Sequence, residues 1–283
     1  MATIVASLAS AHSAIGRSEA RVLLREVLKH DDAYLLAHGD EELSAARAQR
    51  YAALVARRSA GEPIAYITGR REFYGRNFVV TPAVLIPRHE TELLVELALQ
   101  RLPAGAPYRV LDLGAGSGCI GVTIAAERPQ AQVTLLDASE AALEIARANA
   151  GQWAPANTTL LHSDWYSAVA AERYDLIVAN PPYVMEDDAH LQQGDLRFEP
   201  RSALASGADG LHDLRHIIAQ APQHLRAGGW LLLEHGFDQV EACAQLLAAA
   251  GLQDVFNAPD LARIPRVSGG HWLNAISNHI PEA

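Results

Sequence analysis

The tetrapeptide Asn180-Pro181-Pro182-Tyr183 gathers hydrogen-bond acceptors and an aromatic ring in one stiff turn. It follows an apolar run at 176–179, which is typical of a strand buried on both faces. Both prolines lack a backbone N–H, so the turn offers the amide oxygen of Asn180, free backbone carbonyls and the face of Tyr183. That set suits a planar –NH2 group, such as an amide, adenine N6 or cytosine N4. An ordinary turn with a capping Asn is the simpler interpretation of the same four residues.

A second candidate site lies upstream, where Gly114-Ala115-Gly116-Ser117-Gly118 directly follows a predicted strand at 109–113. Glycines allow a sharp turn and a close approach of a ligand to the main chain. The helix that opens at Cys119 has unpaired N–H groups, which favour an anionic or carboxylate ligand. The next predicted strand, 132–136, ends at Asp137, whose carboxylate can accept hydrogen bonds from both hydroxyls of a ribose.

This glycine pattern has two interpretations. The stretch 116–121 reads G-x-G-x-x-G, a weak dinucleotide-binding motif that keeps an NAD-dependent oxidoreductase open. However, the glycines begin two residues after Asp112, and the frame Asp-x-Gly-x-Gly-x-Gly is typical of S-adenosylmethionine sites. A hydride-transfer enzyme also has no use for the tetrapeptide at 180–183, so a methyltransferase is favoured.

Together these motifs resemble the Rossmann-like, S-adenosylmethionine-dependent amino-methyltransferases. Within them the chain is similar to the HemK-type protein-(glutamine-N5) methyltransferases of peptide-chain release factors. The resemblance spans nearly the whole chain and is strongest over 61–236. It depends on segments that flank the two motifs, namely 61–69, Phe73-Tyr74-Gly75, Leu85-Ile86-Pro87-Arg88, Ser163-Asp164-Trp165, 195–200 and 232–236. The protein departs from the family at His89-Glu90, where Pro-Asp is usual, and the turn at 263–266 is more apolar.

The resemblance implies an activity. It implies methyl transfer from S-adenosyl-L-methionine to the side-chain amide nitrogen (N5) of the glutamine in the Gly-Gly-Gln loop of class I release factors, a modification that acts in translation termination. We expect the Asn180 Oδ1 and the Pro181 carbonyl to hold the two amide protons, with Tyr183 packing on the amide plane. The predicted catalytic residues are Asn180, Pro181, Pro182 and Tyr183. The predicted cofactor-binding residues are Gly114, Ala115, Gly116, Ser117, Gly118, Asp137, Trp165 and Asn180.

Other functions stay open at this stage. A nucleic-acid amino-methyltransferase would share the 180–183 motif, but a net charge of −10 and the lack of a basic groove weigh against it. The one dense basic stretch, Arg57-Arg58 with Arg70-Arg71, is either a solvated helix end or a local contact with a ribosome-related partner or an acidic protein surface. A catalytically dead release-factor binder is the non-enzyme alternative. The polar segment 184–198 is a solvated loop, a lid or part of the partner footprint, and Glu234-His235 receives no catalytic role.

Composition limits the class of protein. The 283 residues are 49% hydrophobic, enough for one large or two small domains with a real core. No apolar run approaches the length of a membrane span, and the N-terminus lacks a basic signal region, so we expect a cytoplasmic protein without membrane contact. We also expect a monomer without direct nucleic-acid contact. Cys119 and Cys243 are predicted to be buried thiols in helices, and no Cys/His spacing fits a metal site.

The expected fold is α/β, a Rossmann-like class I methyltransferase sheet with a small N-terminal all-helical domain. The predicted domains are a helical substrate-recognition domain at 1–71, a hairpin linker at 72–88 and the methyltransferase domain at 89–283. Ser18, Asp40 and Ser139 are predicted helix caps, with Gly61 and Gly151 as helix ends, and Thr91 or Glu90 opens a helix over 93–102. Strands are expected near 109–113, 132–136, 158–162, 175–179, 229–234, 253–257 and 271–276.

Overall fold

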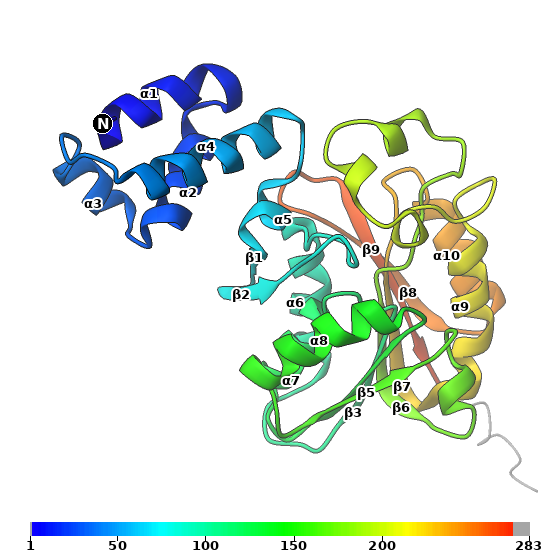
Figure 1. Ribbon diagram of the computed structural model, residues 1–283. Coiled ribbons are helices and arrows are strands. Elements are labelled where there is room, and N and C mark those ends of the chain that lie inside the picture. Colours follow the sequence, from blue (N-terminus) through cyan, green and yellow to red (C-terminus); the bar gives the residue numbers. More distant parts are fainter. Residues whose placement is uncertain (1, 274–283) are drawn as a thin grey trace, which may run out of the picture. The chain divides into compact units, whose positions relative to one another are not determined.

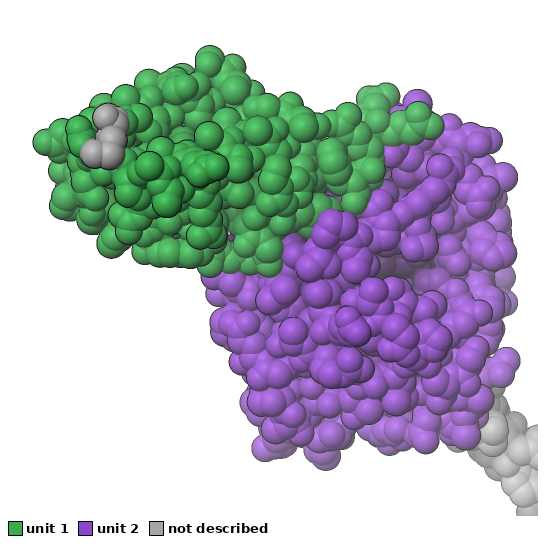
Figure 2. All heavy atoms as spheres, viewed as in Figure 1, with its two compact units in different colours: residues 1–70, 192–198 green, residues 71–191, 199–283 purple. Residues whose placement is uncertain are grey.

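The computed structural model describes residues 2–273 and divides into two compact units (Figures 1 and 2). One unit contains the N-terminal part of the protein through Arg70 together with Gln192–Phe198. The other contains Arg71–Leu191 and the residues from Glu199 onward. A short piece of the segment after the 180–183 motif is therefore grouped with the N-terminal helices.

The first unit is helical. Its own apolar core includes the fully buried side chains of Ile4, Leu23, Leu24 and Leu43. The helices are α1 (Ile4–Ile15), α2 (Arg17–Leu28), α3 (Asp32–Ala37), α4 (Ala45–Ser59) and α5 (Ile64–Thr68).

Two predicted helix caps in this unit are wrong. Ser18 lies inside α2, because the backbone already turns at Gly16, whose φ of 80° ends α1 and places it at the N-cap of α2. Asp40 does not cap α4, because the next residues are held extended by the bridge between Thr3 and Glu42. Ser44 takes that role, and its hydroxyl accepts a hydrogen bond from the backbone N–H of Arg47. The predicted end of α4 at Gly61 is one residue from the observed end, because the C-cap residue Ala60 directly precedes Gly61.

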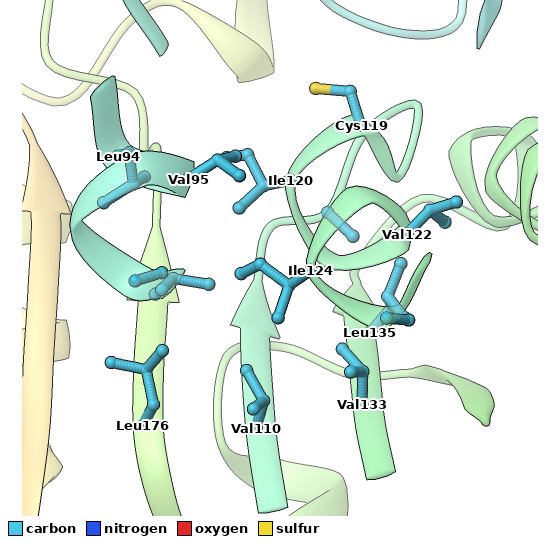
Figure 3. Close-up of a cluster of buried hydrophobic side chains, with 14 of the residues drawn as sticks. Leu94, Val95, Val110, Cys119, Ile120, Val122, Ile124, Val133, Leu135 and Leu176 are labelled. Atoms are coloured by element: carbon cyan, nitrogen blue, oxygen red, sulfur yellow. The ribbon is translucent and has the colours of Figure 1, made fainter. Parts of the chain in front are cut away.

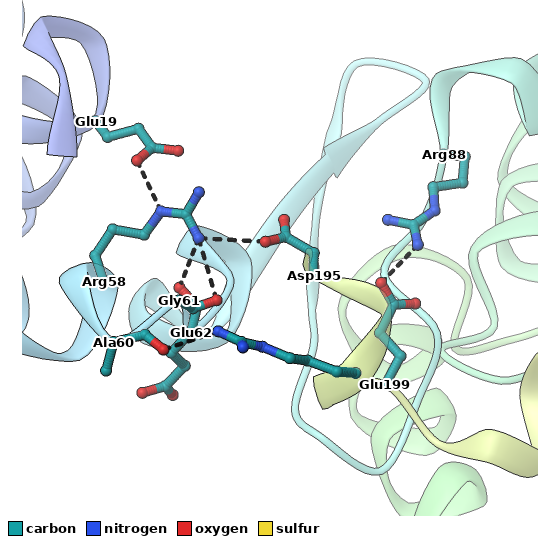
Figure 4. A network of polar contacts seen from close by, with 9 residues as sticks. Glu19, Arg58, Ala60, Gly61, Glu62, Arg88, Asp195 and Glu199 are labelled. Carbon is teal, nitrogen blue, oxygen red and sulfur yellow. Dashed lines mark hydrogen bonds and ion pairs between the residues drawn. The ribbon is translucent and has the colours of Figure 1, made fainter. Parts of the chain in front are cut away.

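Arg57, Arg58 and Arg70 of the basic stretch lie in this unit and are ion-paired. Arg58 Nε lies 2.7 Å from a Glu19 oxygen, and its Nη1 lies 3.2 Å from Asp195 (Figure 4). Arg57 pairs with Glu62 and Arg70 pairs with Glu26. These contacts favour a structural role over an open basic surface, and the Arg58 contact also attaches residues 192–198 to the helices.

The second unit is built on one seven-stranded sheet. Its strand order is β5-β4-β3-β6-β7-β9-β8. The pairs among β5, β4, β3, β6 and β7 are parallel, while β9 is antiparallel to both β7 and β8. This confirms the predicted α/β fold class. The strands are β3 (Arg109–Leu113), β4 (Gln132–Asp137), β5 (Thr158–His162), β6 (Tyr174–Ala179), β7 (Leu225–Glu234), β8 (Gln253–Pro259) and β9 (Pro265–Trp272).

The last strand lies earlier in the sequence than predicted, and residues 274–276 are outside the described residues. The predicted strand begins after the Gly269-Gly270 pair, but both glycines are inside β9. A Cβ on Gly269 would lie 2.6 Å from Leu232 Cδ2, so β9 packs against β7 at a distance that only glycine permits.

Apolar side chains alternate along the strands and fill two cores, one on each face of the sheet. Val110 and Leu176 pack with α6 (Glu92–Arg101) and α7 (Cys119–Glu127), as Figure 3 shows. Helix α8 (Glu140–Trp153) contributes to the same core. Leu111 and Ile177 pack in the other core with α9 (His212–His224) and α10 (Val240–Ala249).

Helix α8 begins as predicted and ends later than predicted. The Ser139 hydroxyl accepts from the Ala142 N–H, which confirms the N-cap. The helix continues past Gly151 to Trp153, whose indole N–H donates to the Asn77 carbonyl at 3.2 Å. A tertiary contact therefore extends the helix beyond the residue that local propensity selected.

The predicted hairpin forms from β1 (Arg70–Phe73) and β2 (Arg76–Val79). Its aromatic residues Phe73 and Phe78 are fully buried in the same core as α6 and α7. The Asn149 amide accepts from Val79 N at 2.7 Å and donates to Val79 O at 3.0 Å, which fixes β2 against α8. The hairpin thus contributes to the second unit, while the domain limits given above stay a prediction.

Cys119 and Cys243 are free and buried in α7 and α10, as predicted. Within residues 2–273, no helix combines the length and the apolar character needed to span a bilayer.

Candidate active site

The ends of adjacent parallel strands position the site. Leu113 at the end of β3 is in register with Leu136 of β4 on one side and with Ala179 of β6 on the other. The glycine turn that follows β3 therefore lies between Asp137 and Asn180, at a strand spacing of roughly 4.8 Å. Strand order across the sheet reverses between β3 and β6, and such a switch point is where open α/β sheets bind ligands.

A cavity of about 510 Å³ opens at this edge, within the size range of small-molecule sites. It brings together most of the residues that the sequence analysis singled out. Those that line it are Gly114, Ala115, Gly116, Ser117, Asp137, Trp165, Asn180 and Pro182.

Three predicted residues lie outside this lining. Gly118 is the N-cap of α7 with a φ of 79°, and a Cβ there would lie 3.1 Å from a methyl group of Val122. It therefore permits the tight entry into the helix. Pro181 is buried, and Tyr183 packs with the core that contains α9 and α10.

The glycine turn and Trp165 form one wall of the cavity. Gly114 and Gly116 have φ values of 68° and 56°, in the left-handed region that favours glycine. A Cβ on Gly114 would lie 3.5 Å from the Trp165 ring, so the ring lies against the main chain of the turn. Trp165 itself has a φ of 45°, and its carbonyl accepts from the Ser163 hydroxyl at 2.7 Å. The indole is therefore held in place by local contacts.

Asp137 is fixed by two backbone donors. Its Oδ2 accepts from Gly116 N at 2.8 Å, and its Oδ1 accepts from Ser139 N at 2.8 Å. Each carboxylate oxygen retains a lone pair, so the pair can still accept from two hydroxyls of a ligand.

A second carboxyl contacts the start of α7 from within the core. Asp112 is fully buried, and its Oδ2 accepts from Gly121 N at 2.8 Å. Burial raises the pKa of Asp112 to about 7, an effect larger than that of the Gly121 hydrogen bond, which lowers it. Among the described residues, its Oδ1 has no hydrogen-bond partner.

Asn180 has a partner that the sequence analysis did not assign. Its Nδ2 donates to the hydroxyl of Thr91 at 3.2 Å, and Thr91 is only 1% exposed. Thr91 takes the N-cap position of α6. It is one of the two residues, with Glu90, that were predicted to open this helix. Its side chain makes no capping hydrogen bond there, because the hydroxyl faces Asn180 instead.

Partly buried Tyr183 pairs with buried Glu234, the last residue of β7. The Tyr183 hydroxyl lies 3.4 Å from Glu234 Oε1. Burial raises the pKa of Tyr183 well above its ordinary value, and burial also raises the pKa of Glu234 to about 7. The nearby hydroxyls of Thr91 and Tyr183 act to lower the pKa of Glu234, but their effect is smaller than that of burial. The only sequence signal for Glu234 was a carboxylate at the end of a buried strand.

One group of side chains outside the cavity could in principle hold a cation. Glu72, His89 and Glu92 each bring one ligand atom to within 4.8 Å of the others. Glu72 already accepts from the N–H of Gly75, and Glu92 accepts from the N–H of Tyr74. These backbone contacts explain the clustering without a metal.

Comparison with known proteins assigns the family. The methyltransferase small domain family matches residues 89–198, and the PrmC N-terminal domain family matches residues 1–69. A release factor glutamine methyltransferase of Xylella fastidiosa is 51% identical over 270 residues, covering 95% of this chain and 98% of the relative. The chain belongs to the release factor glutamine methyltransferase family. Members from Bordetella pertussis and Escherichia coli are 52% and 45% identical, each over 90% of this chain and over 94% and 92% of their own.

Solved structures agree with this family at the level of the fold. A methyltransferase from Pyrococcus furiosus superposes with a TM-score of 0.54 at 18% identity, covering 77% of this chain and 97% of its own. A 16S rRNA methyltransferase of T. Thermophilus, solved with AdoMet and guanosine, gives 0.52 at 22% identity over 72% of this chain and 49% of its own. The class I methyltransferase fold and the family resemblance are confirmed.

Proposed function

We propose that this protein transfers a methyl group from S-adenosyl-L-methionine to the side-chain amide nitrogen of the glutamine in the Gly-Gly-Gln loop of class I release factors. Its family membership over 95% of the sequence supports this activity. The observation that carries the chemistry is the Asn180 amide, which lines the same cavity as the glycine turn and donates to Thr91 through Nδ2. That bond leaves Oδ1 available as an acceptor.

The cavity residues fit the methyl donor. Backbone N–H groups at the start of α7 suit its carboxylate, the fixed Asp137 oxygens suit its ribose hydroxyls, and Trp165 bounds a flat apolar region for the adenine. When bound, S-adenosylmethionine supplies an electrophilic methyl group on a positively charged sulfur.

Orientation of the substrate amide is the task of the 180–183 turn. An amide nitrogen is a weak nucleophile because its lone pair is delocalised into the carbonyl. Acceptors that hold its two N–H groups off the amide plane localise that lone pair and aim it. We assign this role to Asn180 Oδ1 and the Pro181 carbonyl, with Pro182 holding the turn rigid. Asn180 and Pro182 line the cavity, whereas Pro181 does not, so Asn180 Oδ1 is the principal acceptor in this assignment. Tyr183 keeps its proton because its pKa is raised, and its hydroxyl is directed at Glu234.

The protein substrate requires a recognition surface, and we assign it to the helical domain at 1–71, joined by the hairpin at 72–88 to the methyltransferase domain at 89–283. The separate core of the helical unit and its match to a distinct family support this division. Release factors act in the cytoplasm, and we propose that the enzyme works there as a monomer without direct nucleic-acid or membrane contact.

Isotope-labelled donor and a purified release factor test the activity. Mass spectrometry should place one added methyl group on the glutamine of the Gly-Gly-Gln loop, and a release factor with Asn at that position should gain none. The proposal is wrong if the label enters RNA or DNA instead, which would favour the nucleic-acid alternative. Label on any other release-factor residue would also contradict it.

A further inference from the structure

Arg88, which lines the cavity, forms an ion pair with Glu199. Arg88 Nη2 lies 2.5 Å from Glu199 Oε1, as Figure 4 shows. The Glu199 side chain is fully buried, and its Oε2 accepts from the Ile86 N–H at 3.4 Å. The Arg88 side chain is 31% exposed. A buried carboxylate therefore holds one end of a guanidinium whose other end can reach a ligand.

The position of Arg88 places it beside the catalytic turn. It lines the same cavity as Asn180 and Pro182. Its carbonyl accepts from the Thr91 N–H at 3.2 Å, and the Thr91 hydroxyl accepts from Asn180 Nδ2. A single 3₁₀ turn, His89–Thr91, thus connects the cavity arginine to the residue that bonds the catalytic amide.

We propose that Arg88 binds main-chain carbonyl groups of the substrate loop next to the glutamine, and that Glu199 is the positioning residue that holds its guanidinium for this contact. The inference rests on the proposed methylation of the Gly-Gly-Gln loop. It names a group that recognises the loop itself, in addition to the groups that orient the glutamine side chain. Glycine has no side chain, so hydrogen bonds can recognise Gly-Gly only through its backbone.

The donors of Arg88 match that ligand. A guanidinium carries its N–H groups in a rigid, planar fork. Nη2 serves Glu199, and within residues 2–273 neither Nε nor Nη1 is hydrogen-bonded to a protein acceptor. Two sides of the fork are therefore available to acceptors that enter the cavity.

Charge distinguishes between the possible acceptors. Glu199 already neutralises Arg88, so the remaining donors suit a neutral carbonyl better than the carboxylate of the methyl donor. The N–H groups at the start of α7 already suit that carboxylate. Donation to the side-chain carbonyl of the glutamine would draw the nitrogen lone pair into the amide and oppose transfer. The main chain of the loop is the acceptor that fits.

Substitution R88K separates this role from a purely structural one. Lysine keeps a positive charge for Glu199 but lacks the fork. We expect R88K to raise the dissociation constant of the release factor from the enzyme loaded with S-adenosylhomocysteine, the demethylated donor, by about 10- to 100-fold, because hydrogen bonds from a charged group are lost. Calorimetry measures this without turnover. The dissociation constant of S-adenosylhomocysteine itself should stay within about twofold of wild type.

Arg76 provides a matched control. It lies 2.5 Å from Glu127 in the same unit, and its side chain is 20% exposed, but it does not line the cavity. R76K should bind the release factor as wild type does. The inference is overturned if R88K and R76K bind the release factor equally well. It is also overturned if R88K weakens binding of S-adenosylhomocysteine, because Arg88 would then serve the methyl donor.

Two further variants test Glu199 and protect the test against misfolding. E199Q keeps the guanidinium but removes the charge that holds it, so it should weaken release-factor binding by about three- to tenfold and leave S-adenosylhomocysteine binding unchanged. The double variant R88M/E199Q leaves no buried charge unpaired and should bind the release factor at least as weakly as R88K. Wild-type affinity in the double variant, or in E199Q, contradicts the corresponding role.

Turnover gives a separate readout. At saturating release factor, kcat of R88K should stay within about threefold of wild type, because a main-chain contact acts equally in the ground state and the transition state. A large loss of kcat with unchanged binding would contradict the proposal. Wild-type methylation of the glutamine is measured on its own, so its absence refutes the proposed function, whereas the binding comparison decides this inference.

Discussion

Replacement of Asp137 by Asn should weaken binding of the methyl donor without unfolding the protein. Each wild-type carboxylate oxygen accepts one backbone N–H at 2.8 Å and keeps a lone pair for a ribose hydroxyl. Asn retains one such oxygen, whereas the other becomes an NH2 group that faces a backbone donor. The variant therefore loses one backbone hydrogen bond and one ribose hydrogen bond to a charged acceptor.

A hydrogen bond to a charged group contributes about 1.5–3 kcal/mol. The dissociation constant of the donor should thus rise by about 10- to 150-fold. Calorimetry with S-adenosylhomocysteine, the demethylated product, measures this without turnover, and a thermal melt verifies the fold. Glu140→Gln is the control, because it removes a nearby exposed carboxylate from the first turn of α8. If D137N and E140Q bind equally well, Asp137 does not hold the ribose and this part of the site is wrong.

Two further predictions concern the scaffold. Gly61 has a φ of 97°, and a Cβ there would lie 1.9 Å from Arg197 Nη2, which donates to the Ala60 carbonyl. G61A should therefore displace the Arg197 side chain and make residues 192–198 more sensitive to limited proteolysis. G69A is the control, with a φ of 73° and open space, and equal cleavage rates in both variants would contradict the prediction. Burial raises the pKa of Asp112 to about 7, so the folded state binds this proton more tightly than the unfolded state and is destabilised as the pH rises toward 7. D112N cannot ionise, so its melting temperature relative to wild type should increase from about pH 5 to about pH 8; a constant difference would refute this.

The positions of the strand ends could be predicted because local signals determine them. Buried parallel strands are continuous apolar runs, and each is followed by a residue that stops the run, such as Gly114 or Asn180. The register of the parallel strands then places these ends side by side, and this arrangement can be predicted without knowing any side-chain contact. The cavity and most of its lining follow from this arrangement.

The missed features depend on contacts between distant parts of the sequence. Thr91 had the sequence context of a helix cap, and nothing local shows that its hydroxyl bonds Asn180 instead. The carboxylate of Glu234 was likewise visible only as a polar strand end. Residues 192–198 follow the 180–183 turn in sequence, yet they are grouped with the helical unit, where Asp195 pairs with Arg58. Contacts between residues so far apart leave no periodic pattern in the sequence, so they could not be predicted from it.

Single-turnover transfer by Asn180→Ala tests the central claim most directly. The variant lacks the amide that lines the cavity, while the glycine turn, Asp137 and Trp165 remain. By comparison with other preorganised hydrogen-bond partners, methylation of the release-factor glutamine should slow by about 10²- to 10³-fold. Donor affinity should remain close to that of wild type. Full transfer by the variant, or loss of donor binding in place of transfer, would contradict the account.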